Sequence, residues 1–245
     1  MPHYFFDRNA ITGKEVTLSG DTARHLLTVL RVTAGDEITL CDGQNRSYHC
    51  AVTKPLRKEN ILTASIRDIR DCKTEPPVRV TLYQALPKSE KLDVVVQKCV
   101  ELGIHAIQPV ITARTVARPS NESAKWQRLQ KISKSAAEQS MRGIIPRVYE
   151  PVTFEAALSA VGSGDGKFHL IAYENECKVS LYEALKGKPA TDAGIWVGPE
   201  GGFADYEISA LRGKGAVTFT LGSRILRTET AGMAALTRVL FLWEG

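Results

Sequence analysis

Two glycine-bearing segments near the C-terminus carry the residues whose types and spacing best fit ligand chemistry. Val-Gly-Pro-Glu-Gly-Gly-Phe occupies 197–203, and Leu-Gly-Ser-Arg-Ile-Leu-Arg-Thr-Glu-Thr-Ala occupies 221–231. Each follows a short apolar run, so both lie where a buried strand ends and a loop begins, which is where α/β sheets bind ligands. Because glycine lacks a Cβ, a flat ligand could contact bare backbone at Gly198, Gly201, Gly202 and Gly222.

These segments resemble the methyl-donor loops of the RsmE family of ribosomal RNA (uracil-N3)-methyltransferases, within the SPOUT superfamily. The family signatures G-P-E-G-G and L-G-x-R-x-L-R-T-E-T are matched at 198–202 and 221–230. The resemblance implies S-adenosylmethionine as methyl donor and N3 of a uridine in 16S ribosomal RNA as acceptor, within the small ribosomal subunit. It extends along nearly the whole chain, through His25-Leu26, Val29-Leu30-Arg31, Glu90-Lys91, Gln97-Lys98, Glu101-Leu102-Gly103 and Glu138-Gln139 with Arg142.

Methyl transfer is an in-line displacement at a sulfonium carbon, so the protein must mainly align donor and acceptor and manage the acceptor's proton. This chemistry requires no metal. The backbone near 221–226 is expected to read the adenine edge of the donor. The residues expected to contact the donor are Tyr173, Val197, Gly198, Gly202, Leu221, Gly222, Leu226, Arg227 and Thr230.

Uracil N3 carries an imide proton, so a general base or a group that stabilises the deprotonated ring is needed. Glu200 and Glu229 are candidate bases, with Glu138 as a further one, and Arg227 or Arg142 could stabilise the anionic ring. Two structural alternatives stay open. Glu200 could instead anchor its own loop through backbone N–H groups, and Arg227 could pair with Glu229.

Positive charge is concentrated between Arg114 and Arg147, where eight basic residues face only two acidic ones, Glu122 and Glu138. The whole chain carries a net charge of +5, so the remainder is nearly neutral. Such a concentration favours contact with an RNA backbone, although a solvated helix face would have the same composition. The candidate RNA contacts are Arg8, Arg24, His25, Arg31, Lys91, Arg114, Lys131, Lys134 and Arg142.

A domain boundary is expected near residue 75, where the polar stretch 71–77 ends in two prolines. Before it, short β-rich runs predict a small β-barrel with one helix at about 22–31, capped by Asp21 or Thr22. The resemblance implies that residues 1–74 form a PUA-like RNA-binding domain. The predicted strands of this barrel are 15–18, 37–41, 48–52 and 61–66.

Residues 75–245 alternate strand and helix, which predicts an α/β domain with a mostly parallel sheet. The resemblance makes this a SPOUT methyltransferase domain with a C-terminal trefoil knot, and it implies a homodimer. Helices are expected at 89–102, 123–141, 178–186, 205–213 and 229–241. Strands are expected at 78–83, 106–110, 169–173, 195–197 and 217–221.

Composition and motifs exclude several other classes of protein. No apolar run approaches the ~18–20 residues of a membrane span, and the N-terminus lacks a secretion signal, so we expect a cytoplasmic protein. Five cysteines without C-x-x-C spacing argue against a zinc site. The segment 162–167 resembles a phosphate loop only superficially and is expected to be a flexible loop. Two alternatives remain: a SPOUT enzyme acting on another RNA or base atom, and an RNA-binding protein without catalysis.

Overall fold

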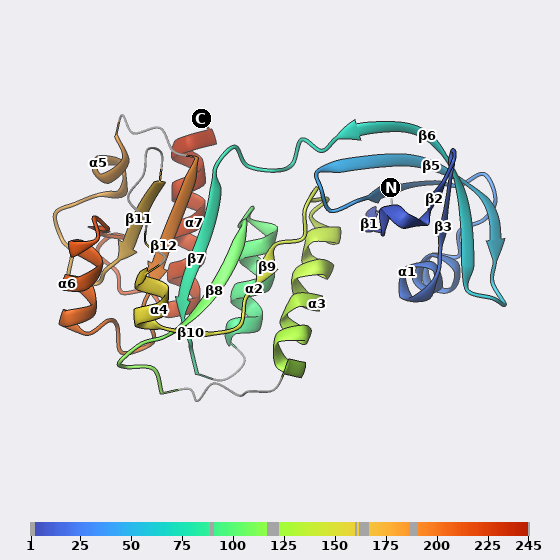
Figure 1. Cartoon of the computed structure of the whole chain (residues 1–245). Coiled ribbons are helices and arrows are strands. Elements are labelled where there is room, and N and C mark those ends of the chain that lie inside the picture. The colour runs from blue at the N-terminus through green and yellow to red at the C-terminus, as the bar shows by residue number, and fades with distance from the viewer. Residues whose placement is uncertain are drawn as a thin grey trace. The chain divides into compact units, whose positions relative to one another are not determined.

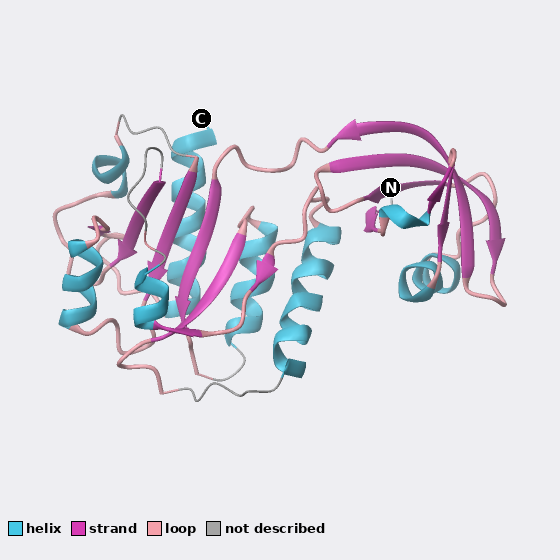
Figure 2. Ribbon diagram, viewed as in Figure 1, coloured by secondary structure: helices cyan, strands magenta, loops and turns pink. Residues whose placement is uncertain are grey.

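The computed structural model describes residues 3–88, 91–116, 123–159, 161, 167–186 and 191–244 (Figures 1 and 2). Glu90, Arg118, Glu122 and residues 162–166 of the predicted loop at 162–167 therefore lie outside the described residues, and Lys167 is the first residue of a strand. The chain divides into two compact units. The first comprises Met1–Glu75 with Ala137–Ile145, and the second comprises Pro76–Ala136 with Pro146–Gly245.

The first unit is built on a six-stranded sheet in the order β1-β4-β5-β6-β3-β2. Neighbouring strands are antiparallel except β1 and β4, which run parallel. Alternate side chains of these strands bury a core that includes Val16, Leu40 and Leu62. The strands are β1 (His3–Phe5), β2 (Ile11–Thr12), β3 (Glu15–Leu18), β4 (Glu37–Cys41), β5 (Arg46–Leu56) and β6 (Ile61–Asp71).

The helix of the first unit differs from the sequence prediction at both ends. A 3-10 turn, η1, covers Arg8–Ala10, and α1 spans Gly20–Arg24 and continues into a π-helical segment, η2, at His25–Val29. The cap is Ser19, and the prediction of Asp21 or Thr22 was wrong because the backbone is already helical at those positions and extended at Ser19.

The π-helical segment η2 is stabilised at its C-terminal end by one arginine side chain. The Arg57 guanidinium donates to the carbonyl oxygens of Leu27, Arg31 (3.2 Å) and Val32 (2.9 Å). Carbonyl groups at the end of a helix lack partners within the helix, so this side chain satisfies them. Arg57 therefore fixes the segment that carries the predicted RNA contacts Arg24, His25 and Arg31.

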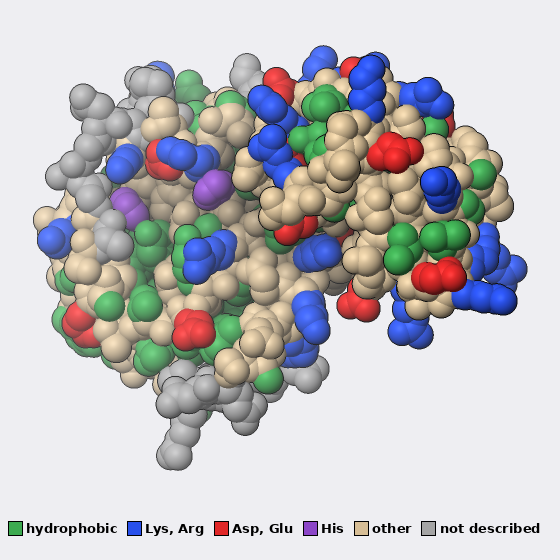
Figure 3. Space-filling model, turned by 45° about the vertical axis from the view of Figure 1, so that its right-hand side comes forward, with side chains coloured by type: hydrophobic (Ala, Val, Ile, Leu, Met, Phe, Trp, Pro, Cys, Tyr) green, Lys and Arg blue, Asp and Glu red, His purple; other side chains and the backbone are tan. Residues whose placement is uncertain are grey.

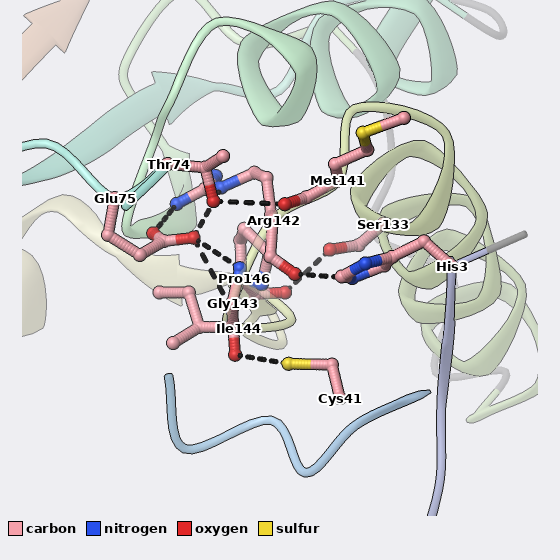
Figure 4. Close-up of polar contacts among 10 residues, drawn as sticks. All are labelled: His3, Cys41, Thr74, Glu75, Ser133, Met141, Arg142, Gly143, Ile144 and Pro146. Atoms are coloured by element: carbon pink, nitrogen blue, oxygen red, sulfur yellow. Dashed lines mark hydrogen bonds and ion pairs between the residues drawn. The ribbon is translucent and has the colours of Figure 1, made fainter. Parts of the chain in front are cut away.

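Residues 137–145 belong to the first unit although they follow the second unit's residues in sequence (Figure 4). Glu75 forms an ion pair with Arg142 and accepts a hydrogen bond from the Gly143 amide (2.8 Å). The Thr74 hydroxyl donates to the Met141 carbonyl oxygen (2.9 Å), and His3 Nε2 donates to that of Arg142 (3.0 Å). The predicted linker thus carries two of the contacts that hold this segment.

The second unit contains a seven-stranded sheet in which all paired strands of the described residues are parallel, which confirms the predicted α/β class. The order is β10-β8-β7-β12-β11-β13, and β9 also pairs with β8. The strands are β7 (Arg79–Ala85), β8 (Ala106–Ile111), β9 (Arg147–Val148), β10 (Val152–Thr153), β11 (Lys167–Ala172), β12 (Asp192–Val197) and β13 (Val217–Phe219).

Helices cover both faces of this sheet (Figure 1). On one face, Gly232 of α7 lies against the Leu82 side chain, since a Cβ at Gly232 would be 3.3 Å from Leu82 Cδ2. On the other face, Tyr83 stacks on Trp196, which contacts Phe154 of α4. The helices are α2 (Lys91–Glu101), α3 (Ser123–Gln139), α4 (Phe154–Ser159), α5 (Leu181–Leu185), α6 (Asp205–Gly213) and α7 (Thr228–Glu244).

The sequence analysis missed several short elements, namely η1, β1, β2, β9, β10 and α4. Strands of two or three residues are too short to show an alternating pattern, and they exist because a longer neighbour offers a partner. Within the described residues, no helix combines the length and the apolar character that crossing a bilayer requires.

Candidate functional site

Three loops of the second unit begin at the same edge of the parallel sheet. Ala172, the last residue of β11, is in register with Val197 of β12 and with Phe219 of β13. The chain leaves these strands into the segment beginning at Tyr173, the glycine loop (residues 198–204) and the β13 loop (residues 220–227). The structure therefore gathers the predicted donor contacts from three separate segments at the carboxyl ends of adjacent strands, the usual ligand-binding edge.

The glycine loop turns back on itself. The Gly202 amide donates to the Pro199 carbonyl oxygen (2.9 Å), and Gly202 has a φ of +68°, which side chains rarely adopt. A Cβ at Gly202 would lie 2.0 Å from Glu174 Oε1, and one at Gly198 would lie 3.1 Å from Gly202 Cα. Gly198 and Gly202 are thus required by the fold of the loop itself.

Gly222 in the β13 loop is required for a different reason. Its φ is +108°, yet a Cβ there would meet no atom within 4 Å. Neighbouring Leu221 and Leu226 are half-buried, whereas Arg227 and Thr230 are exposed. The backbone at Gly222 therefore borders open space, which fits a site that presents peptide groups to a ligand.

The glycine loop is joined to the start of α7 by a buried hydrogen-bond chain that the sequence analysis missed. The Thr228 hydroxyl donates to the Gly198 carbonyl oxygen (2.6 Å) and accepts from Gln84 Nε2 (2.8 Å). Gln84 is 0% exposed, and its Oε1 has no hydrogen-bond partner within the described part of the chain. The available signal was a single amide residue in an otherwise apolar strand end, since buried polar groups need partners.

The two carboxylates predicted as catalytic lie on either side of one lysine. Lys91 Nζ donates to Glu200 Oε1 (2.8 Å) and is 3.6 Å from Glu229 Oε2. Glu200 Oε1 also accepts from the Lys88 amide (3.2 Å). Glu229 Oε2 is buried and has no hydrogen-bond partner in the described ranges, because the lysine is slightly too distant.

The contacts of Glu200 set the direction in which its pKa shifts. Partial burial raises the pKa of Glu200, but the hydrogen bonds from Lys91 and from backbone amides outweigh it and hold the pKa below the ordinary value. The hydrogen bond to Glu200 correspondingly raises the pKa of Lys91. Glu200 is therefore a poor proton acceptor, and its contacts favour the alternative in which it anchors its loop.

Arg114, predicted to contact RNA, lies against the glycine loop. Its Nη1 donates to the Gly201 carbonyl oxygen (2.8 Å). Its backbone is fixed by the buried carboxylate of Glu207, which accepts from the amides of Ala113 and Ala204, both at 2.8 Å. Two of the predicted RNA contacts, Lys91 and Arg114, thus have partners in the donor region.

The other RNA candidates of the first unit lie in different environments. Arg24, His25 and Arg31 are exposed on the α1–η2 segment. Arg8 is 3.9 Å from the Asp42 carboxylate. Arg142 is 2% exposed and paired with Glu75, so its guanidinium has a structural partner and its burial argues against the predicted contact with RNA or with the uracil ring. Glu138 accepts a hydrogen bond from the Phe5 amide (3.2 Å) in the same unit.

The basic helix α3 keeps only part of its charge available. Lys131 is exposed and Lys134 is half-buried, whereas Arg128 forms a two-pronged ion pair with Asp93 of α2. Lys125 Nζ lies 5.5 Å from the centre of the Trp126 ring. On the face drawn in Figure 3, Lys and Arg side chains are interspersed with Asp and Glu side chains. Asp93 of α2 therefore offsets part of the positive charge of this helix.

Comparison with known proteins gives the family. Residues 74–240 match the model of an RNA methyltransferase domain, and residues 18–63 match that of an RNA methyltransferase PUA domain. The chain is 32% identical to ribosomal RNA small subunit methyltransferase E of Bacillus subtilis, covering 100% of this chain and 98% of the relative. The Synechocystis protein of the same name is 34% identical, and the match covers 94% of this chain and 74% of the relative.

Two solved structures are also similar to this chain. One is ribosomal RNA small subunit methyltransferase E from Neisseria gonorrhoeae bound to S-adenosyl methionine, with a TM-score of 0.86, 33% identity and 99% and 98% of the two chains covered. The other is a putative methyltransferase from Legionella pneumophila in complex with the bound cofactor SAM. Its TM-score is 0.84 and its sequence identity is 30%, with 98% of this chain and 97% of that chain covered. With its signature loops at one sheet edge and both domains matched, the chain belongs to the RsmE family of RNA methyltransferases.

Proposed function

We propose that this protein transfers a methyl group from S-adenosylmethionine to N3 of a uridine in 16S ribosomal RNA, in the assembled small subunit. The observation that carries the proposal is the convergence of the glycine loop and the β13 loop at the carboxyl ends of β12 and β13. The names of the relatives, which specify methylation of small-subunit ribosomal RNA, support the choice of substrate.

The donor site suits S-adenosylmethionine because the open backbone at Gly222 leaves room for a flat adenine ring. Leu221, Gly222 and Leu226 would hold the adenine, and Tyr173, Val197, Gly198, Gly202 and Thr230 would line the remainder of the donor. When bound, the donor supplies an electrophilic methyl group on a positively charged sulfur.

Glu229 is the better candidate for the general base. Its Oε2 has no hydrogen-bond partner in the described structure, with the Lys91 ammonium 3.6 Å away, and would accept the N3 proton, whereas Glu200 Oε1 already accepts from Lys91 Nζ and from the Lys88 amide. Loss of that proton leaves an anionic ring whose N3 is nucleophilic. The exposed Arg227, two residues before Glu229, would offset this negative charge.

The remaining parts of the proposal concern partners and topology. The PUA domain in residues 1–74, with Arg24, His25 and Arg31, would bind RNA together with Lys131 and Lys134 of α3. Methylation of the small ribosomal subunit would take place in the cytoplasm. Residues 75–245 would contain the methyltransferase activity.

Two observations support a trefoil knot and a homodimer. The strand β13 lies at the sheet edge beyond β11, and α7 packs on β12 and β7, so the C-terminal segment returns across the sheet, as a knotted C-terminus would. Ile225 and Phe241 are 87% and 77% exposed, and a homodimer interface would cover these side chains.

The direct test is methylation by the purified protein with S-adenosylmethionine labelled in its methyl group. Small subunits and naked 16S ribosomal RNA that lack the modification would be compared as substrates, and the digested nucleosides analysed by mass spectrometry. We expect label in 3-methyluridine, more from subunits than from naked RNA, and none with Gly222→Val. Label in another nucleoside would refute the N3 assignment. The absence of label while donor binding is intact would refute the choice of 16S ribosomal RNA as the substrate.

A further inference from the structure

The glycine loop is held at its two ends by buried groups. At its start, the Gly198 carbonyl oxygen accepts from the Thr228 hydroxyl. At its end, the Ala204 amide donates to the Glu207 carboxylate, which is 0% exposed. Buried hydrogen bonds of this kind are needed for folding, because an unpaired polar group in the interior is costly. The centre of the loop has a different kind of support.

The centre of the loop is held by two cations from separate segments. Lys91, the first residue of α2, donates to the Glu200 side chain on one side. Arg114, in the loop after β8, donates to the Gly201 carbonyl oxygen, and its aliphatic stem lies 3.5 Å from where a Gly201 Cβ would be. Two neighbouring residues of the loop are thus held, Glu200 through its side chain and Gly201 through its backbone.

Both cations are themselves well positioned. The turn that carries Arg114 is closed by the Thr115 hydroxyl, which accepts from the Thr112 amide (2.9 Å), and by the bond from the Ala113 amide to Glu207. Lys91 also faces Glu229 at 3.6 Å, so one ammonium group stands between the glycine loop and the first turn of α7. The two donor-binding segments are therefore linked through Lys91.

We propose that Lys91 and Arg114 are positioning residues that hold the glycine loop in its donor-binding conformation, and that Lys91 also sets the loop against Glu229. This inference rests on the proposed function, since it assigns these cations to the donor site and not to RNA. Side-chain exposure supports a functional role. Lys91 is only partly covered, and an ion pair as accessible as Lys91–Glu200 contributes little to folding stability. Arg114 is exposed, and its partner is a backbone carbonyl oxygen.

The test compares Lys91→Met and Arg114→Met with a matched control, Lys98→Met. Lys98 lies on the same helix as Lys91 and pairs with Glu101 at 2.9 Å, away from the glycine loop. Two quantities are measured on the full chain without RNA: the dissociation constant for S-adenosylmethionine by calorimetry, and the hydrogen exchange of a peptide covering residues 198–204. The thermal midpoint of each variant shows whether it is folded.

We expect each Met variant to weaken donor binding about tenfold, the equivalent of about 1.4 kcal/mol. Exchange in the loop peptide should accelerate, because a loop without these contacts opens more often and breaks the bond from the Gly202 amide to the Pro199 carbonyl oxygen. The thermal midpoint of each Met variant, and both quantities in Lys98→Met, should stay near wild type. In steady-state assays the KM for the donor should rise more than kcat falls for Arg114→Met. Lys91→Arg should recover most of the lost affinity because it keeps the charge.

The outcomes separate this inference from the proposed function. If loop exchange and donor affinity in both Met variants match Lys98→Met, the positioning role is refuted, whatever the activity of the wild type. If the wild type neither binds the donor nor methylates RNA, the proposed function fails, while the exchange comparison still decides whether the cations hold the loop. Lost affinity in Lys91→Arg as large as in Lys91→Met would refute the role of its charge.

Discussion

Replacing Thr228 with Val tests the buried link between α7 and the glycine loop. The substitution keeps the side-chain shape but removes the bond to the Gly198 carbonyl oxygen (2.6 Å) and the acceptor for Gln84 Nε2 (2.8 Å). Gln84 Nε2 retains its bond to the Ala85 carbonyl oxygen (3.1 Å), so the loss is partial on that side. Hydrogen bonds in proteins contribute about 0.5–1.5 kcal/mol each, which predicts a loss of about 2 kcal/mol.

A loss of about 2 kcal/mol corresponds to a decrease of about 4–8 °C in the thermal midpoint for a chain of this size. The same change should weaken S-adenosylmethionine binding, because the Gly198 carbonyl loses its fixed direction. Thr237→Val is the matched control, since Thr237 is exposed on the same helix and donates only to the Met233 carbonyl oxygen one turn earlier.

Calorimetric unfolding and donor titration of both variants provide the measurement. If Thr228→Val and Thr237→Val have the same thermal midpoint and the same donor affinity, the hydrogen-bond chain does not stabilise the glycine loop and the reasoning is wrong. A lower midpoint with unchanged affinity would confine the chain's role to folding.

Three further predictions concern other parts of the molecule. Charge reversal at Lys131 and Lys134 should weaken RNA binding and flatten its dependence on salt, and an unchanged salt slope would contradict a role for α3 in RNA contact. Arg142→Met should destabilise the protein by about 3–5 kcal/mol, because it leaves the Glu75 carboxylate without its guanidinium partner. Denaturant unfolding measures this loss. Burial lowers the pKa of His169 to about 4, and its Nδ1 accepts from Trp196 Nε1 (3.1 Å). Its contribution to stability should therefore fall from pH 6.5 toward pH 4, where the unfolded chain binds the extra proton, and Trp196 fluorescence in a variant lacking the other tryptophans should titrate near pH 4. A transition near pH 6.5 would contradict this.

Local patterns in the sequence determined the class of fold and the place of the two glycine-bearing loops. Apolar runs followed by glycine predicted strand ends at 197 and 221, close to the ends of β12 at Val197 and β13 at Phe219. Alternating strands and helices predicted a parallel sheet. These features follow from periodicity and from glycine's backbone freedom, which act over a few neighbouring residues and can be read without a structure.

Only the tertiary structure decided which partner each charged side chain has. Lys91 and Glu200 are 109 residues apart in sequence and Arg142 and Glu75 are 67 apart, so no local spacing relates them. The sequence shows that Arg142 and Lys91 are cations but not whether they face solvent, RNA or a carboxylate. Burial and pairing depend on how distant segments pack, and the structure pairs the buried Arg142 with Glu75 and the partly covered Lys91 with Glu200.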